Sequence, residues 1–324
     1  MKKLILVSSA VAMLFSACQK NALTDKTDTQ SAITKRSCGS MEVLAEQMKA
    51  DPTLEARLNA YEAAVQDNIK KMEAGTSNFR LVNGVIEIPV VVNVLYRTAA
   101  ENVSLAQIQS QIDVLNEDYN ATNADFSLVP STFSGVKANV GIRFVLDQVI
   151  RKSTTKTSWK TDDAMKKSTK GGINPTSPTT KLNLWVCTLS GGILGYAQFP
   201  GGASATDGVV ILNTGFGRTG TAAAPYNKGR TATHEVGHWL NLRHIWGDAT
   251  CGSDLVNDTP LHNTANYGCP AAGHKSTCTG TPIEMTMNYM DYTDDACMYM
   301  FSAGQKARIL ATFATGGPRA TFAQ

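Results

Sequence analysis

The sequence predicts an α/β (α+β) fold with helices packed on a sheet. Four segments rich in apolar and β-branched residues are typical of buried strands: residues 86–96, 140–150, 182–189 and 209–212. Apolar side chains recur at three- and four-residue spacings over residues 105–119, which indicates a helix with one buried face. Capping boxes at Ser104 with Gln107 and at Ser302 with Gln305 predict the start of this helix and of a last helix through Phe313.

Composition sets the scale and the class of the protein. The 324 residues suffice for one large domain and an accessory segment. A hydrophobic share of 43% with 18% charged residues is typical of a globular protein. The net charge of +3 comes without a basic run, so nothing indicates a nucleic-acid partner.

The N-terminus predicts export. A positive start, Lys2-Lys3, precedes an apolar run over residues 4–15 that is too short to span a bilayer. Small residues then lead to Cys18, as in bacterial lipoprotein signals, so we expect residues 1–18 to be removed and Cys18 to be acylated for membrane attachment. The alternative is an ordinary secretory signal that is cleaved nearby. Either route permits disulfides.

Residues 19–79 are expected to form a prosegment. Residues 19–35 are polar and suit a flexible tether. An amphipathic helix follows, with charged residues on a solvated face and apolar ones at Leu54, Leu58, Tyr61, Val65, Ile69 and Met72. Residues 75–78 break this pattern and suit a cleavable loop, so the larger domain begins at about Arg80.

Three histidines form the candidate metal site. His234 and His238 are one helical turn apart, so both imidazoles can bind one zinc ion. Glu235 lies beside the first ligand, where its carboxylate can deprotonate a water on the zinc. His244 joins them only if the helix ends and turns back near Asn241, and Asn tolerates the left-handed backbone of such a turn. Three protein ligands and a water are typical of a catalytic zinc.

The run His-Glu-Val-Gly-His-Trp-Leu-Asn-Leu-Arg-His, followed by Met290, resembles the pappalysin branch of the metzincin metalloproteases. Most metzincins have glycine where this chain has Asn241. The resemblance implies a metzincin-like catalytic domain over residues 80–324, with a twisted mixed sheet, a backing helix and an active-site helix. It also implies a strand at the cleft edge within residues 191–199 and an irregular, disulfide-linked lower subdomain.

The same resemblance implies roles for three further residues. Cys38, in Arg-Ser-Cys-Gly, is similar to the cysteine-switch residue that occupies the zinc of metzincin zymogens; the alternative is a stray or intermolecular thiol. Met290 would form the hydrophobic floor beneath the histidines. Tyr292 would stabilise the oxyanion of the reaction, unless its hydroxyl is purely structural.

A calcium site is expected after the histidines. Residues 251–260 combine oxygen ligands with turn residues, but their spacing does not match an EF-hand, and a polar turn is the alternative. Because pappalysins carry calcium in this region, the resemblance implies a site formed by Asp254, Thr259 and a carbonyl near Val256.

Four cysteines lie in the irregular C-terminal part, and the sequence leaves three pairings open. The absence of CxxC pairs argues against a structural zinc. The resemblance implies the pairs Cys251–Cys278 and Cys269–Cys297. Cys187, inside an apolar strand, is expected to be a buried thiol.

Two acidic residues suggest a specificity pocket. Residues 287–292, around Met290, are the counterpart of the methionine turn of metzincins. Asp294 and Asp295 follow this turn, where metzincins build the pocket for the residue after the scissile bond. A carboxylate in a narrow pocket favours a cation, and Arg can meet it with two hydrogen bonds. The resemblance implies cleavage before Arg, sometimes Lys, with Asp295 favoured over Asp294; a solvated acidic turn is the alternative. Cleavage between Phe79 and Arg80 would then be self-processing.

The leading hypothesis is an exported zinc endopeptidase, made as a lipid-anchored zymogen, that acts on proteins or peptides. One competing hypothesis is another HExxH hydrolase, such as an amidase of small substrates; His244 and Met290 argue against it. The other is a surface-binding lipoprotein with an inactive protease fold; an intact Glu235 argues against it.

Overall fold

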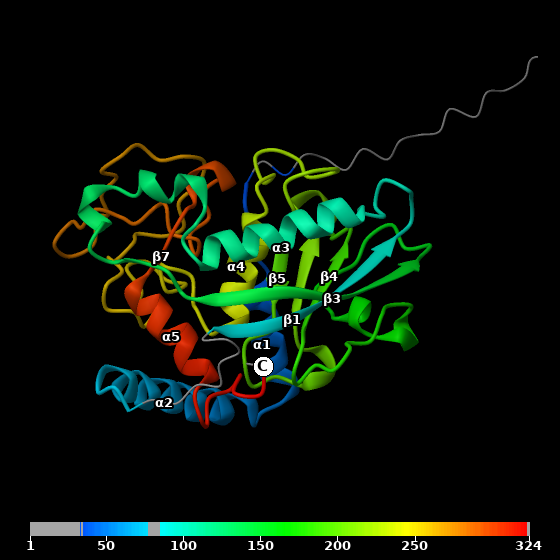
Figure 1. The fold of residues 1–324 in the computed structure, drawn as a ribbon, viewed down its shortest axis with the longest axis horizontal. Helices are drawn as coiled ribbons and strands as arrows, with labels where there is room; N and C mark the ends of the chain where they lie inside the picture. The colour runs from blue at the N-terminus through cyan, green and yellow to red at the C-terminus, as the bar shows by residue number, and fades with distance from the viewer. Residues whose placement is uncertain (1–32, 34, 77–84, 323–324) are drawn as a thin grey trace, which may run out of the picture. The chain divides into compact units, whose positions relative to one another are not determined.

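A mixed five-stranded sheet forms the centre of the fold and confirms the predicted class (Figure 1). Its strands, in spatial order, are β3 (Ile142–Ser153), β1 (Ile86–Tyr96), β4 (Leu182–Cys187), β6 (Val209–Leu212) and β5 (Gly195–Ala197). The first four are parallel, and β5 pairs antiparallel with β6 at the edge. The edge strand therefore lies within the segment expected to border the cleft.

The structure is a computed structural model that describes residues 33, 35–76 and 85–322. The predicted signal peptide, the acylation of Cys18 and the cut between Phe79 and Arg80 lie outside these residues. Residues 33–324 belong to one compact unit. No helix in the described part of the chain is long and apolar enough to cross a bilayer.

Side chains alternate between two apolar clusters on the two faces of the sheet, as the two-residue period of a strand requires. In β4, Leu184 and Val186 join the larger cluster, whereas Trp185 and Cys187 join the smaller one. The thiol of Cys187 is free and buried, as expected. Because both faces are covered, the central strands are apolar throughout.

Two helices pack on the larger cluster. Helix α3 (Leu105–Tyr119) contacts β3 and helix α4 (Arg230–Trp239), which in turn contacts β5 and β6 (Figure 1). Ser104 caps α3 by accepting a hydrogen bond from the backbone of Gln107, but the Gln107 amide does not return a bond to Ser104. Instead this amide donates to Phe216 O at 2.8 Å. Only one of the two hydrogen bonds of the predicted capping box is therefore present.

The part after α4 contains little regular structure. Its strand β7 (Phe301–Ser302) pairs with β2 (Lys137–Ala138), and helix α5 (Ala303–Phe313) begins with the complete capping box predicted at Ser302 and Gln305. Short 3-10 helices in the described residues are η1 (Ala124–Leu128), η2 (Ser131–Phe133), η3 (Ala164–Lys166), η4 (Ser168–Lys170), η5 (Ser204–Thr206), η6 (Asn213–Gly215) and η7 (Asp295–Cys297).

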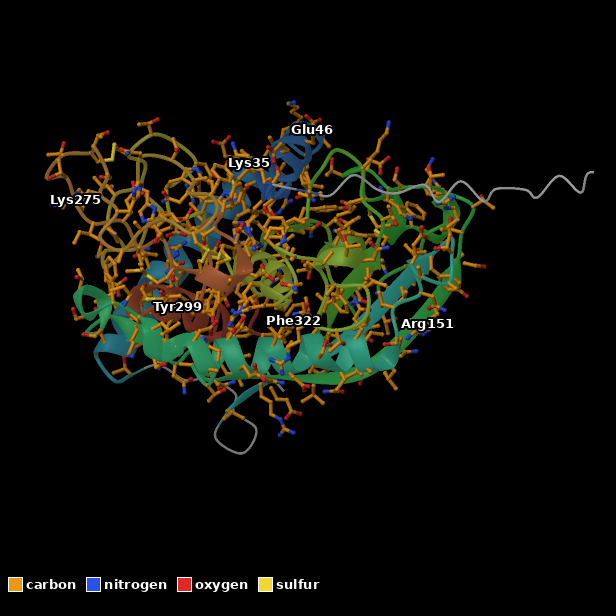
Figure 2. The ribbon with its side chains drawn as sticks, turned by 90° about the horizontal axis from the view of Figure 1, so that it is seen from above. Lys35, Glu46, Arg151, Lys275, Tyr299 and Phe322 are labelled. Atoms are coloured by element: carbon orange, nitrogen blue, oxygen red, sulfur yellow. A yellow bond between two sulfur atoms is a disulfide. The ribbon has the colours of Figure 1, made fainter. Side chains whose placement is uncertain are left out.

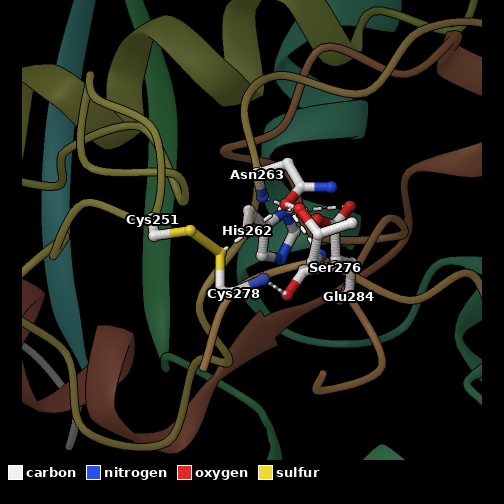
Figure 3. Close-up of a disulfide and its surroundings, with 7 residues drawn as sticks. Cys251, His262, Asn263, Ser276, Cys278 and Glu284 are labelled. Atoms are coloured by element: carbon white, nitrogen blue, oxygen red, sulfur yellow. Dashed lines mark hydrogen bonds and ion pairs between the residues drawn. A yellow bond between two sulfur atoms is a disulfide. The ribbon is translucent and has the colours of Figure 1, made fainter. Parts of the chain in front are cut away.

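Two disulfides, Cys251–Cys278 and Cys269–Cys297, cross-link this irregular part in the pairing that the family resemblance implied. Figure 3 shows the first of them beside the buried carboxylate of Glu284, which accepts a hydrogen bond from the backbone of Asn263 at 2.7 Å. Covalent links and buried polar contacts here replace the ladder of a sheet.

The expected prosegment contains two helices, α1 (Ser40–Ala50) and α2 (Leu54–Glu73). Helix α1 lies against the edge strand β5, and α2 lies against α5. Leu54 and Val65 of α2 are fully buried, so the apolar stripe predicted for this helix packs against the part of the chain that contains α5.

Candidate active site

The active-site helix ends where the third histidine requires it to end. Helix α4 stops at Trp239, and Asn241 adopts a left-handed backbone with φ of 69°. The N–H of Leu242 then donates to Gly237 O at 2.9 Å, which reverses the chain within three residues. This turn carries His244 back toward the two histidines of the helix.

The three histidine side chains converge. Nε2 of His238 lies 3.2 Å from Nε2 of His234 and 3.1 Å from Nε2 of His244, and all three rings are buried. Their other ring nitrogens are bound to Tyr289 O at 2.7 Å, to Leu242 O at 2.8 Å and to Asp248 Oδ1 at 2.5 Å.

These contacts fit a cation at the centre. A carbonyl oxygen only accepts, so Nδ1 of His234 and Nδ1 of His238 must donate, which leaves their Nε2 lone pairs facing one another. Burial also lowers the pKa of both histidines well below its usual value, so the rings are neutral. Unprotonated nitrogens at hydrogen-bond distance repel each other unless a metal ion lies between them, and carbonyl and carboxylate partners are typical of zinc-bound histidines.

Cys38, in the expected prosegment, brings a fourth candidate ligand atom to the three histidines. Its Sγ and the three histidine nitrogens all lie within 4.8 Å of one another, and all four side chains are buried. Three histidines and one cysteine are a complete tetrahedral set for zinc. Within the described residues this is the one group of His, Cys, Asp or Glu side chains that converges in this way.

The carboxylate of Glu235 is covered by the prosegment. Its Oε2 lies 3.1 Å from Cys38 Sγ and accepts a hydrogen bond from Ser40 Oγ at 2.9 Å. Burial raises the pKa of the Glu235 carboxyl to about 7, which is suited to a group that both takes and gives a proton near neutral pH.

Two residues of the methionine turn pack against the histidine motif, Met290 at Gly237 of helix α4 and Tyr292 at His244. Met290 is fully buried, and a Cβ on Gly237 would lie only 2.5 Å from its sulfur, so the glycine in the histidine motif allows the close packing of the helix on this methionine. The hydroxyl of Tyr292 accepts the N–H of Cys38 at 3.1 Å. The ring of Tyr292 packs edge-on against His244.

The side chain of Arg36 is buried among Asp295, Thr293 and Tyr226, and we refer to these three residues as the Asp295 pocket. Arg36 Nη2 lies 2.5 Å from Asp295 Oδ1, and its Nε donates to Thr293 O at 3.1 Å. Its guanidinium also lies over the ring of Tyr226, with Cζ 4.9 Å from the centroid. Arg36 and Asp295 are 2% and 0% exposed, so this ion pair is shielded from water.

The start of helix α4 fixes the Asp295 carboxylate. Its Oδ2 accepts the backbone N–H groups of Lys228 at 2.8 Å and Arg230 at 3.2 Å, which leaves Oδ1 for Arg36. A carboxylate at a helix N-terminus is favoured by the helix dipole. The backbone N–H of Asp294, by contrast, binds Gly268 O at 2.9 Å, and Asp294 makes no direct ion pair with Arg36 among the described contacts.

The prosegment also pairs with the edge strand. Cys38 forms a parallel bridge with Gly195, in which Gly39 N donates to Gly195 O at 2.9 Å. Ser40 Oγ accepts the N–H of Ala197 at 2.8 Å. Sequence reasoning missed Arg36 and Ser40 as site residues, although Arg36 opens the motif that suggested the cysteine switch and Ser40 follows it directly.

The residues expected to bind calcium also lie together. Thr259 Oγ1 is 2.9 and 3.0 Å from the two carboxylate oxygens of Asp254 and 2.9 Å from Val256 O. Asp254 is buried, and burial raises the pKa of its carboxyl to about 6. Their oxygen atoms therefore converge at one point of the turn.

The sequence of this chain is similar to those of known proteins. The Peptidase_M43 profile, described as Pregnancy-associated plasma protein-A, matches residues 180–314. An extracellular metalloprotease of Verticillium alfalfae is 34% identical over 240 residues, which cover 69% of this chain and 77% of that one. The chain belongs to the Peptidase_M43, or pappalysin, family. It is therefore a metalloprotease, and the family together with the histidine cluster implies zinc.

Two solved pappalysins from Tannerella forsythia resemble the structure closely. Mature mirolysin in complex with a cleaved peptide matches with 46% identity and a TM-score of 0.71, over 74% of this chain and 96% of that one. A promirolysin mutant matches with 41% identity and a TM-score of 0.79, over 89% and 97% of the two chains. The match to the proprotein thus extends over more of this pappalysin than the match to the mature form.

Proposed function

We propose that this chain is the zymogen of an extracellular zinc endopeptidase that cleaves proteins or peptides before Arg and, less readily, before Lys. The observation that carries the proposal is the position of Arg36. Two residues from Cys38, which faces the histidines, its guanidinium fills the pocket of Asp295. The prosegment thereby supplies the side chain that a substrate would supply.

The chemistry of this pocket favours arginine. Asp295 is desolvated, so an apolar or acidic side chain would leave its charge buried without a counter-charge, at a cost of about 3–5 kcal/mol. A guanidinium also reaches Thr293 O and stacks near Tyr226. A lysine ammonium would keep the charge but lose the planar contacts.

Each reacting group has a role in hydrolysis. His234, His238 and His244 would hold the zinc ion, which would supply polarisation of the scissile carbonyl and acidification of a water molecule. Glu235 accepts the proton of that water on a carboxylate oxygen and delivers it to the leaving amine. The Tyr292 hydroxyl donates a hydrogen bond to the oxygen on which negative charge develops. Met290 supports the histidines from below.

The prosegment occupies all of these groups. Cys38 faces the three histidines, Cys38 and Ser40 cover the Glu235 carboxylate, and the N–H of Cys38 binds the Tyr292 hydroxyl. These contacts support latency through the cysteine. They also support residues 19–79 as the prosegment and residues 80–324 as the catalytic domain. Cleavage between Phe79 and Arg80 would place Arg80 in the Asp295 pocket, in agreement with self-processing.

Export and calcium complete the proposal. Relatives of this chain are named extracellular metalloproteases, in agreement with a signal over residues 1–18. We propose that Cys18 carries a lipid until processing releases the mature form. The converging oxygens of Asp254, Thr259 and Val256 support a calcium ion that stabilises the irregular part.

Cleavage of a mixed peptide library by the processed enzyme tests the function. We expect Arg, and more weakly Lys, to be enriched directly after the cut, and Glu235→Ala to abolish cleavage. Asp295→Ala should remove the preference, whereas the matched Asp294→Ala should retain it. A profile without basic residues after the cut, or an unchanged profile in Asp295→Ala, would refute the assignment of specificity.

A further inference from the structure

A second cation of the prosegment has its own partner outside the arginine pocket. Lys35 Nζ lies 3.9 Å from the centroid of the Tyr267 ring, at the distance of a cation–π contact. Lys35, which is labelled in Figure 2, and Tyr267 are both exposed, whereas the neighbouring Arg36 is buried. Two adjacent basic residues thus bind two different acceptors, a buried carboxylate and an exposed aromatic face.

The backbone next to Tyr267 is anchored to the segment that carries Asp295. The following residue, Gly268, accepts the backbone N–H of Asp294 at 2.9 Å, and the next, Cys269, is bonded to Cys297. Two links therefore join the tyrosine segment to the segment that carries Asp295. The ring also lies 6.0 Å from that of Tyr292. A backbone anchored in this way loses little conformational freedom when a ligand binds.

The order of these sites along the cleft assigns Tyr267 to a substrate position. Cys38 faces the histidines, Arg36 lies in the Asp295 pocket, and Lys35 lies one residue further from the histidines. In a substrate, the scissile bond lies at the histidines and the arginine after it fills the pocket. A substrate whose backbone follows the same path as residues 35–38, in either direction, would place the residue after that arginine at Tyr267.

We propose that Tyr267 forms a second specificity subsite, which selects a basic residue two positions after the scissile bond. The inference rests on the proposed cleavage before Arg and adds a neighbouring determinant to it. The half-exposed carboxylate of Asp294, on the segment linked to Gly268, adds negative charge nearby. Substrates in which Arg-Lys or Arg-Arg follows the cut would satisfy both subsites.

The test compares two fluorogenic peptides that differ only after the arginine: one continues with Lys, the other with norleucine, its uncharged analogue. With processed wild-type enzyme, we expect kcat/KM for the Lys peptide to be roughly 2–5-fold higher, the effect of an exposed cation–π contact. Tyr267→Leu should bring this ratio to about one. The matched Tyr267→Phe keeps the aromatic face and should keep the ratio.

The outcomes separate the inference from the function on which it rests. Efficient cleavage before Arg with equal kcat/KM for the two peptides would overturn the subsite alone, and the wild-type ratio decides this even if Tyr267→Leu fails to fold. No cleavage before Arg in either peptide would overturn the proposed specificity and the subsite together. In the full chain, Lys35→Met should also speed activation by a similar factor; an unchanged rate would argue against the contact.

Discussion

Glu62 of the prosegment helix and Arg308 of helix α5 form a two-pronged ion pair, with both carboxylate–guanidinium distances at 2.8 Å. The Arg308 side chain is only 2% exposed. It also donates to Asn241 O at 3.3 Å, in the turn that positions His244. The prosegment is therefore held at a second place, far in sequence from Cys38, and this place is connected to the metal site.

The first prediction concerns acid. Burial opposes ionisation of Glu62, but the hydrogen bonds and charge of Arg308 outweigh it and lower the pKa of Glu62 from 4.5 to about 2. Its stabilising effect is therefore complete above pH 4.5 and is lost as the pH falls from about 4.5 to 2. Glu62→Gln should loosen α2 at neutral pH, measured as faster amide hydrogen exchange in residues 54–73. The difference from wild type should shrink in acid; a constant difference would contradict this account.

The second prediction concerns Arg36. Arg36→Ala leaves Asp295 buried without its cation, which costs on the order of 3 kcal/mol of prosegment binding. Activation, measured as the half-time to full peptidase activity, should be faster by about two orders of magnitude. Arg36→Lys retains the charge, so its activation half-time should lie between those of the wild-type protein and Arg36→Ala. Equal half-times for all three proteins would show that the pocket does not hold the prosegment.

The third prediction concerns Ser40. Ser40→Ala removes a donor to Glu235 and leaves the N–H of Ala197 without its acceptor, at a cost of about 1–3 kcal/mol. The Ser40→Ala precursor should therefore activate roughly tenfold faster than the wild-type precursor. Cys38→Ala should also activate faster than the wild-type precursor. Ser37→Ala is the matched control, because only the backbone oxygen of Ser37 binds Leu194 N. If Ser37→Ala and Ser40→Ala activate alike, Ser40 has no special role.

The fourth prediction concerns metal content. Wild-type protein should hold one zinc at the histidines, and His244→Ala should lose both zinc and activity. Asp248→Ala removes the acceptor of His244 Nδ1 and should weaken zinc binding about 10–100-fold in a competition titration with a chelator. Asp147→Ala, which removes a surface partner of Lys181, is the control. Full zinc occupancy in His244→Ala would remove this residue from the ligand set.

The fifth prediction concerns calcium. If Asp254, Thr259 and Val256 O bind this ion, added calcium should raise the thermal midpoint of the wild-type protein. Asp254→Asn should abolish the rise, and Mg²⁺ should not replace calcium, because it favours a smaller and more regular site. A midpoint that does not respond to calcium in wild type would leave the segment as a polar turn.

Local patterns predicted the parts of this site that depend on neighbours in sequence. Spacing of four residues placed His234 and His238 together, and the conformational tolerance of Asn241 allowed His244 to join them. The last helix followed in the same way from its capping residues. The disulfide pairs needed the family resemblance, because four cysteines at these spacings permit three pairings equally.

Contacts between distant segments were not predictable in this way. Arg36 and Asp295 are separated by 259 positions, and nothing in either local sequence indicates the other. Glu62 was expected on a solvated helix face, but it binds Arg308. Strand β3 runs to Ser153, beyond its predicted end, because its polar last residues continue to pair with β1 up to Tyr96. In each case the structure of the residue depends on a partner far away in the sequence, which the local sequence does not identify.

The position of helix α2 has a consequence for how this enzyme becomes active. Both regions that hold the prosegment, residues 36–40 in the cleft and residues 54–73 on α5, precede residues 77–84 in the chain. A cut within residues 77–84 divides the polypeptide without breaking one contact described above. The severed N-terminal piece becomes a bivalent ligand. Binding of residues 36–40 keeps residues 54–73 at high effective concentration, and the reverse also holds. Processed protein can therefore remain inactive until dilution releases the severed piece, or until a second cut separates its two binding regions.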